Sequence, residues 1–401
     1  MKRKRHILKI LLFAGGFFLW TGTYSQESLR FHFDDHYTIT ERHDIRQRVN
    51  GRYKGFIYRE WRGVLGAAEF NGPEVLYTGS FYEFRKMTRN LSSIAKVIDD
   101  VIPASFSIDS YGRIKAEEGA YVPPVQNIPV LPDKPVKTGD IWRSYGIRVV
   151  DPKGGHPTRV SVYCEYRYEG LESTKGGDRH RIRGQYALRY RNGDDPYGDP
   201  ELKETHGKHI LDIYIPVGGD SDIFMRDTVQ DQYYYSDGTV IEESGAILTW
   251  FDDVSGMDRE SLIEKVERIT AQDGNNDITV SERPEGLLLQ IQNIHFYPDE
   301  DRILPDQENK ISTIARILRE ASGHMFLVTG HTADIGTAES QQILSEKRAK
   351  VVVDMLEGMG IPAANMIYQG KGGTEPIAPN DIEENRAKNR RVEITILEGE
   401  P

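Results

Sequence analysis

Apolar and polar residues alternate along much of the chain between residues 26 and 282, as in residues 182–190 and 209–215. Successive side chains of a β-strand point to opposite faces of a sheet, so this pattern predicts strands with one buried and one wet face. Turn-forming residues separate the runs, and Asp237-Gly238 lies between two of them as a hairpin turn would. We therefore expect an all-β antiparallel region here.

Proline is concentrated between Val122 and Pro135, where the sequence contains five prolines. Neither a helix nor a central strand tolerates that density, because proline lacks the N–H that both structures use. We interpret residues 122–135 as an extended linker between a β-rich module at residues 26–121 and a second β-rich module at residues 136–282. A single large β-domain with a proline-rich loop is the alternative.

The first 25 residues are typical of an export signal. Basic residues 2–5 precede a mostly apolar run at residues 7–22, and the small residues Thr23 and Ser25 suit a cut before Gln26. The run is short against the roughly 20 residues that span a bilayer, which favours a cleaved signal peptide over an uncleaved anchor. No Cys stands at the cleavage site, so we expect a periplasmic protein that is not a lipoprotein and has no transmembrane segment in its mature chain.

The sequence contains no serine-hydrolase elbow, no zinc-protease helix and no phosphate-binding loop. Asp273, Asn275 and Asp277 resemble the start of a calcium loop but lack its later Gly and acid, which favours a solvated turn. The lone Cys164 cannot form an internal disulfide and is expected to be a buried apolar residue. A net charge of −11 argues against a nucleic-acid partner. We expect no enzyme, no cofactor and no metal site.

The pattern changes after about residue 283. Apolar residues spaced three and four apart predict two helices between Leu304 and Met359, with a short buried strand at residues 325–329 between them. Strands are expected at residues 287–294 and 391–397, and Gly323 and Gly360 are expected helix ends. Alternating helices and strands predict an α/β sandwich over residues 283–401, so the whole chain is expected to be an α+β multidomain protein.

Five short motifs in this C-terminal segment resemble, in the same order, those of the OmpA-like, peptidoglycan-associated domain family. The motifs are Asn293-Ile-His-Phe-Tyr-Pro298, Val328-Thr-Gly-His-Thr332, Leu344-Ser-Glu-Lys-Arg-Ala349, Gly370-Lys-Gly372 and Asn389-Arg-Arg-Val-Glu-Ile394. The β-rich region loosely resembles domains beside OmpA-like tails in spirochaete envelope proteins. The resemblance implies a wall-associated envelope protein that binds the peptide stem of peptidoglycan without changing it chemically, with β-modules that could engage envelope protein partners.

The family binds the diamino acid of the stem with one acid and one base. Its Asp after the Gly-His-Thr turn takes the ammonium, and the Arg of its Leu-Ser-x-x-Arg-Ala helix takes the carboxylate through two charge-assisted hydrogen bonds. The base here is Arg348, but the acid position holds Ala333, and an acid follows one step later at Asp334. The helix-start Asn of the family falls at Gln341. The ligand implied is diaminopimelate, or ornithine with a different charge spacing.

The resulting candidates for ligand binding are Asp334, Arg348, Thr332, Gln341 and Arg391. Two outcomes are open for the acid: either the loop at residues 333–338 shifts so that Asp334 takes the ammonium, or the domain is a protein-interaction scaffold that has lost peptidoglycan binding. Arg391 either binds carboxylates or clamps the last strand to an acidic neighbour, and Arg390 should face the other way because strand side chains alternate. His331 is expected to stabilise the turn, and Asn389 to bond the backbone.

Overall fold

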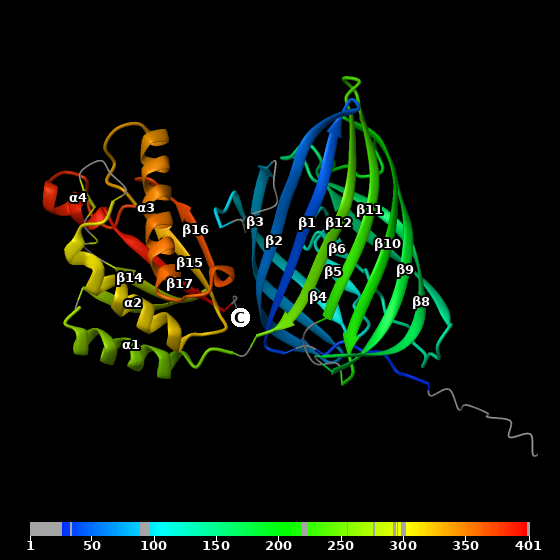
Figure 1. Cartoon of the computed structure of the whole chain (residues 1–401), viewed down its shortest axis with the longest axis horizontal. Helices are drawn as coiled ribbons and strands as arrows, with labels where there is room; N and C mark the ends of the chain where they lie inside the picture. Colours follow the sequence, from blue (N-terminus) through cyan, green and yellow to red (C-terminus); the bar gives the residue numbers. More distant parts are fainter. Residues whose placement is uncertain are drawn as a thin grey trace, which may run out of the picture.

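The computed structural model describes residues 26–398 except 33, 89–95, 176, 219–222, 255, 276, 292, 293, 295 and 298–301. The expected export signal lies outside the described residues. The chain forms an antiparallel β-region followed by a unit in which helices pack on a small sheet (Figure 1), which confirms the predicted α+β arrangement. Within the described part of the chain, no helix is long and apolar enough to cross a membrane.

The β-region is one 12-stranded sheet with the order β5-β4-β3-β2-β1-β12-β11-β10-β9-β8-β7-β6. Its strands are β1 (His36–Val49), β2 (Arg52–Asn71), β3 (Glu74–Thr88), β4 (Asp100–Asp109), β5 (Ile114–Ala116), β6 (Val125–Gln126), β7 (Ile141–Val150), β8 (Thr158–Thr174), β9 (Gly177–Arg191), β10 (Leu202–Pro216), β11 (Ile223–Tyr235) and β12 (Val240–Asp253). Because β1 pairs with β12 along its whole length, the expected modules at 26–121 and 136–282 share one sheet. This corrects the two-module interpretation in favour of a single β-domain.

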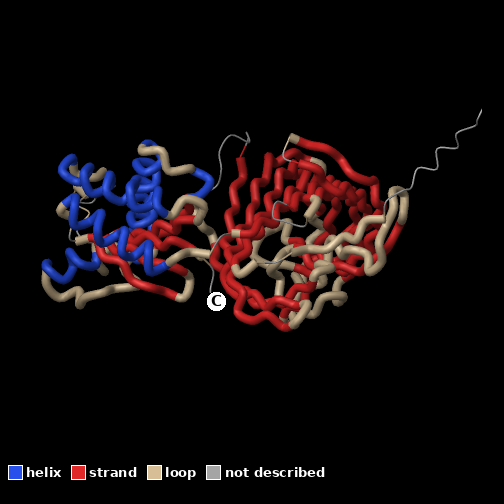
Figure 2. The backbone as a smooth tube through the Cα atoms, turned by 90° about the horizontal axis from the view of Figure 1, so that it is seen from below, coloured by secondary structure: helices blue, strands red, loops and turns tan. Residues whose placement is uncertain are grey.

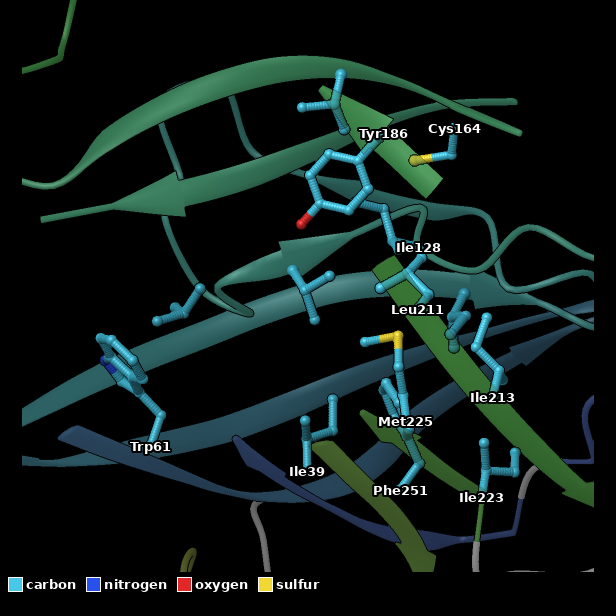
Figure 3. Close-up of a cluster of buried hydrophobic side chains, with 14 of the residues drawn as sticks. Ile39, Trp61, Ile128, Cys164, Tyr186, Leu211, Ile213, Ile223, Met225 and Phe251 are labelled. Atoms are coloured by element: carbon cyan, nitrogen blue, oxygen red, sulfur yellow. The ribbon is translucent and has the colours of Figure 1, made fainter. Parts of the chain in front are cut away.

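The sheet curves around one apolar core, to which the proline-rich segment contributes. Val122, Val125, Ile128 and Leu131 are all buried in the same cluster as the inward side chains of the strands. Figure 3 shows Ile128 directed into this interior together with side chains from several strands. The segment is therefore a core element that contains the short edge strand β6, and its prolines are tolerated because few of its N–H groups are needed for a ladder.

Cys164 on β8 lies in this core and is fully buried, as expected from its place in an alternating run. Burial disfavours the thiolate and raises the pKa of its thiol to about 12. The hairpin expected at Asp237-Gly238 is also present between β11 and β12, where Gly238 has a positive φ of 81° that suits glycine.

The C-terminal unit contains a five-stranded sheet of order β13-β14-β17-β15-β16. Its elements are α1 (Arg259–Asp273), β13 (Ile278–Arg283), β14 (Gly286–Ile291), η1 (Pro305–Gln307), α2 (Glu308–Glu320), β15 (Met325–Gly330), α3 (Ala338–Gly358), η2 (Ala363–Asn365), β16 (Met366–Gly370), α4 (Glu383–Asn389) and β17 (Val392–Leu397). The helices cover one face of this sheet (Figure 2), as predicted for an α/β sandwich.

Helix α1 and strand β13 belong to this unit, although the boundary expected between residues 282 and 283 assigned them to the β-rich module. Leu262, Val266 and Ile269 lie on one face of α1 and are buried in the C-terminal core. Asp258 caps the first turn of the helix, and Gly274 ends it with a left-handed conformation. The boundary between the two units therefore lies nearer the N-terminus than expected, just before α1.

The sheet face that the helices leave uncovered packs against the β-domain. Leu327, Ile367 and Leu397, from three strands of the small sheet, are buried in one cluster with Tyr82 and Phe84 of β3. Side chains alternate along a strand, so on each of these strands the residues next to Leu327, Ile367 and Leu397 face the helices instead. The result is an apolar contact between the two units, which lie side by side in Figure 1.

A short stretch of the β-domain also extends the small sheet. The amide of Tyr368 on β16 donates to the carbonyl of Lys96 at 2.8 Å, and the amide of Ile98 donates to the carbonyl of Tyr368 at 3.0 Å. Residues 96–98 thus run parallel to β16 and pair with an edge that would otherwise expose unpaired backbone groups. The two units are therefore joined by main-chain hydrogen bonds as well as by apolar packing.

Candidate functional site

The site is built where β15 ends and α3 begins. At Gly330, the last residue of β15, a Cβ atom would lie 2.1 Å from the carbonyl oxygen of Ser345 on α3, so only glycine fits there. This close approach holds α3 against the end of the strand. Thr337 caps the helix by accepting a hydrogen bond from the amide of Ser340 at 3.2 Å.

Arg348 is buried on α3, one turn beyond Ser345. Its guanidinium carbon lies 4.8 Å from the centre of the Phe296 ring, a geometry that favours attraction between the cation and the ring face. Phe296 was not singled out from the sequence, although it belongs to the first family motif. The ring holds the charged group in a fixed position beside the helix.

Arg391 is buried at the start of β17. Its Nε donates to Glu393 Oε1 at 2.7 Å, which is the clamp to an acidic neighbour that was one of its two expected roles. Its Nη1 is also buried and has no hydrogen-bond partner among the described residues. Arg390 follows the last residue of α4 and bonds to Glu383 at the start of that helix, so both arginines precede β17 and the alternation expected of a strand does not apply to them.

Glu393 was missed in the sequence, although it stands two residues after Arg391 and so shares its strand face. Burial raises the pKa of its carboxyl group, but hydrogen bonds from His331 and Arg391 and their charges outweigh burial and lower it to about 2. His331 Nε2 lies 3.4 Å from Glu393 Oε2, and the backbone amide of His331 donates to the carbonyl of Arg391 at 3.0 Å. His331 therefore stabilises the turn, as expected.

Thr332 follows directly in the chain. Its amide donates to the carbonyl of Gly372 at 2.8 Å, while its hydroxyl is buried without a hydrogen-bond partner in the described part of the chain. Buried polar groups normally find a partner, because leaving one unpaired costs about 1–3 kcal/mol. The Thr332 hydroxyl and the Arg391 Nη1 are thus two unpaired donors, carried by residues that follow β15 and precede β17 at the same end of the small sheet.

Ala333 and Asp334 are neighbours in the chain but differ in their exposure to solvent. Ala333 is buried, whereas Asp334 is exposed and its carboxylate accepts a hydrogen bond from Gln341 Nε2 at 3.1 Å. The oxygen of the Gln341 amide accepts from the amide of Gly373 at 3.0 Å, so Gln341 joins two loops. Seven residues of α3, a rise of about 10 Å, separate Gln341 from Arg348. The structure therefore brings Asp334 and Gln341 together at one end of α3 and places Arg348 two turns further along.

Asn389 supports this loop from behind. It is fully buried, accepts hydrogen bonds from the amides of Ile377 and Ala378 at 2.9 and 3.0 Å, and donates to Asn380 Oδ1 at 2.9 Å. Asn380 Oδ1 in turn accepts from the amide of Asp334 at 3.2 Å. Asn389 thus bonds the backbone, as expected. The relay through Asn380 had no signal in the sequence, because it depends on two distant loops meeting.

The family model described as the OmpA family matches residues 295–390. The chain is similar to the outer-membrane lipoprotein YfiB of Pseudomonas aeruginosa, with 38% identity over 96 residues, which are 24% of this chain and 57% of that protein. It is also 33% identical over 103 residues to the peptidoglycan-binding protein ArfA of Mycobacterium tuberculosis, covering 26% of this chain and 32% of that protein.

Among solved structures, the cell wall anchor of the T6SS from Pseudomonas aeruginosa matches with 30% identity and a TM-score of 0.30, over 33% of this chain and 96% of that one. The chain spans little more than half the length of YfiB, so the similarity concerns one domain. The motifs, the α/β sandwich and the family match agree with one another. The chain carries a C-terminal domain of the OmpA family.

Proposed function

We propose that this chain is an exported, non-catalytic protein of the periplasm that attaches to the cell wall by binding the peptide stem of peptidoglycan. The observation that carries the proposal is the pair of buried arginines, Arg348 and Arg391, in a domain of the OmpA family. One of them, Arg391, presents a buried N–H without a partner among the described residues. The name of the relative ArfA, a peptidoglycan-binding protein, supports the same reading.

The chemistry of the stem suits these side chains. Diaminopimelate carries a carboxylate and an ammonium at the end of its side chain, and a guanidinium meets a carboxylate with two parallel, charge-assisted hydrogen bonds. Because Phe296 and Glu393 already fix the two guanidinium groups, little further side-chain freedom is lost on binding. The Thr332 hydroxyl offers a third donor. Ornithine has no side-chain carboxylate, so two arginines favour diaminopimelate.

In this proposal Asp334 binds the ammonium at the rim of the site. It is the sole acid of the loop at residues 332–338, and its hydrogen bond from Gln341 orients the carboxylate. Asp334 is exposed, so its attraction for an ammonium is weakened by water. The buried arginines are therefore expected to supply most of the affinity.

Sedimentation with purified sacculi tests the proposal. Residues 26–401 should sediment with the sacculi, and Arg348→Ala should weaken binding by tenfold to a thousandfold, the usual cost of about 2–5 kcal/mol for losing one partner of a desolvated charge pair. Arg390→Ala is the matched control, because Arg390 precedes Arg391 in the chain but is half-exposed and bonds to the exposed Glu383. If the unmodified chain and Arg348→Ala sediment equally poorly, the proposal fails.

A scaffold that has lost this ligand is the second candidate. The observation that favours it is the burial of the apolar Ala333 at the position of the family acid, with Asp334 directed to the surface. Under this reading the unmodified chain does not bind sacculi, and Ala333→Asp creates binding. Strong sedimentation of the unmodified chain excludes it.

A further inference from the structure

Two tyrosines stand exposed side by side on the outer face of the β-domain. Tyr145 on β7 and Tyr163 on β8 are direct cross-strand partners, and 75% and 53% of their surfaces are exposed. Their ring centres are 4.8 Å apart, with 50° between the ring planes. Most large apolar side chains of these strands face the core, so adjacent exposed rings mark a candidate binding surface.

A groove of about 340 Å³ is lined by Tyr163, the ring that Tyr145 contacts. The residues that line it are Arg143, Tyr163, Glu165, Gln185, Tyr186, Ala187, Lys208 and His209. They come from four neighbouring strands, β7 to β10, so the surface extends over three strand spacings or about 14 Å. The short side chain of Ala187 leaves its middle open. Figure 1 shows β8, β9 and β10 on the side of the sheet away from the OmpA-like domain.

The charges in the groove largely compensate one another. Arg143 Nε donates to Glu165 Oε2 at 2.8 Å, and Gln185 Nε2 donates to Glu165 Oε1 at 3.3 Å. Lys208 is the one lining residue whose charge has no ion pair within the described chain. The groove therefore offers flat polar groups that donate and accept hydrogen bonds, together with an aromatic surface and little net charge.

We propose that this groove binds a neutral polysaccharide, the glycan strand of peptidoglycan. Sugar rings present C–H groups on their faces, which pack against the electron-rich faces of aromatic rings. Their hydroxyl and amide groups can bond to Gln185, Glu165 and Arg143. An anionic membrane surface would instead call for a cluster of Lys and Arg residues, which this groove lacks. The choice of polymer rests on the proposed function, whereas the preference for a neutral glycan rests on the groove alone.

Calorimetric titration of the mature chain with an oligomer of β-1,4-linked N-acetylglucosamine tests the inference. We expect measurable binding, which the double variant Tyr145→Ala/Tyr163→Ala weakens about tenfold, because it removes the aromatic surface on which the sugar rings pack. Tyr53→Ala is the matched control, because Tyr53 is also 53% exposed but lies on β2. Binding should survive this control change.

Arg348→Ala separates this inference from the proposed function. That variant should keep its affinity for the free oligomer while it loses sacculi, so either activity can fail without the other. The inference is overturned if the unmodified chain does not bind the oligomer, or if the double tyrosine variant binds it equally well. Tyrosine-dependent sedimentation with phospholipid vesicles, without oligomer binding, would overturn it in favour of a membrane surface.

Discussion

Arg391 donates its Nε–H to Glu393 at 2.7 Å, and this contact fixes a buried guanidinium whose Nη1 points away without a partner among the described residues. The same carboxylate lies 3.4 Å from His331, which precedes the unpaired hydroxyl of Thr332. One acid thus organises the end of β15 and the start of β17. The ionised carboxylate of Glu393 holds Arg391 in this position.

Replacing Glu393 by Gln should make the contribution of this carboxylate visible as a pH dependence. The folded-state pKa is lowered from 4.5 to about 2, so the ionised group stabilises the fold above pH 4.5 and this stabilisation is lost as the pH falls toward 2. The difference in unfolding free energy between the unmodified chain and Glu393→Gln should therefore be largest above pH 4.5 and shrink below it. Urea denaturation at a series of pH values measures it, and a difference independent of pH would contradict the expectation.

Asp334→Ala should weaken binding to sacculi much less than Arg348→Ala does. Asp334 is exposed, and charge interactions at exposed positions are usually worth up to about 1 kcal/mol, which is less than a tenfold change. Arg348 is buried on α3, so its removal strands the ligand carboxylate in a desolvated site. Sedimentation titrations of both variants compare the two losses. Equal losses would mean that Asp334 enters the buried site with Arg348.

The spacing of apolar residues along the sequence predicted individual helices and strands of the C-terminal unit. Helix α3 and strands β15 and β17 lie where their apolar spacing placed them. Helix α1 was missed although Leu262, Val266 and Ile269 follow helical spacing, because the strand-like runs before it set the expectation for the whole region.

Pairing between distant segments had no local signal. Strands β1 and β12 are separated by about half of the chain, and nothing in either strand specifies the other as its neighbour, so one sheet was divided into two modules. The position of Asp334 likewise depends on Gln341, and on Asn380 in a remote loop. The place of Arg348 on a helix could be predicted from the sequence, whereas the conformation of the loop that carries Asp334 could not.

A buried ion pair inside the β-domain should be sensitive to the loss of either partner. Arg148 donates two hydrogen bonds to Glu41, at 2.8 and 2.7 Å, and both side chains are almost fully buried. Arg148→Met removes the cation that pairs with the buried Glu41 carboxylate and leaves it only the contact with His43 Nε2 at 2.6 Å, which should cost about 3–5 kcal/mol; the double variant Glu41→Gln/Arg148→Met should recover part of this loss. The exposed Arg143 provides the control, since Arg143→Met should cost less than about 1 kcal/mol. Urea denaturation measures all three, and similar losses at both arginines would contradict the account.

Phe84→Ala should loosen the contact between the β-domain and the OmpA-like domain. Phe84 is fully buried in the cluster that joins them, and truncation of a buried Phe costs about 3–5 kcal/mol. The amides of Tyr368 and Ile98, which form the main-chain bonds between the units, should then exchange with solvent deuterium faster, while amides between β15 and β17 keep their protection. Phe70→Ala is the control, because Phe70 is exposed on β2 and its truncation should leave the exchange of these amides unchanged. Unchanged exchange at residues 96–98 in Phe84→Ala would show that the backbone pairing holds the two units together without the apolar contact.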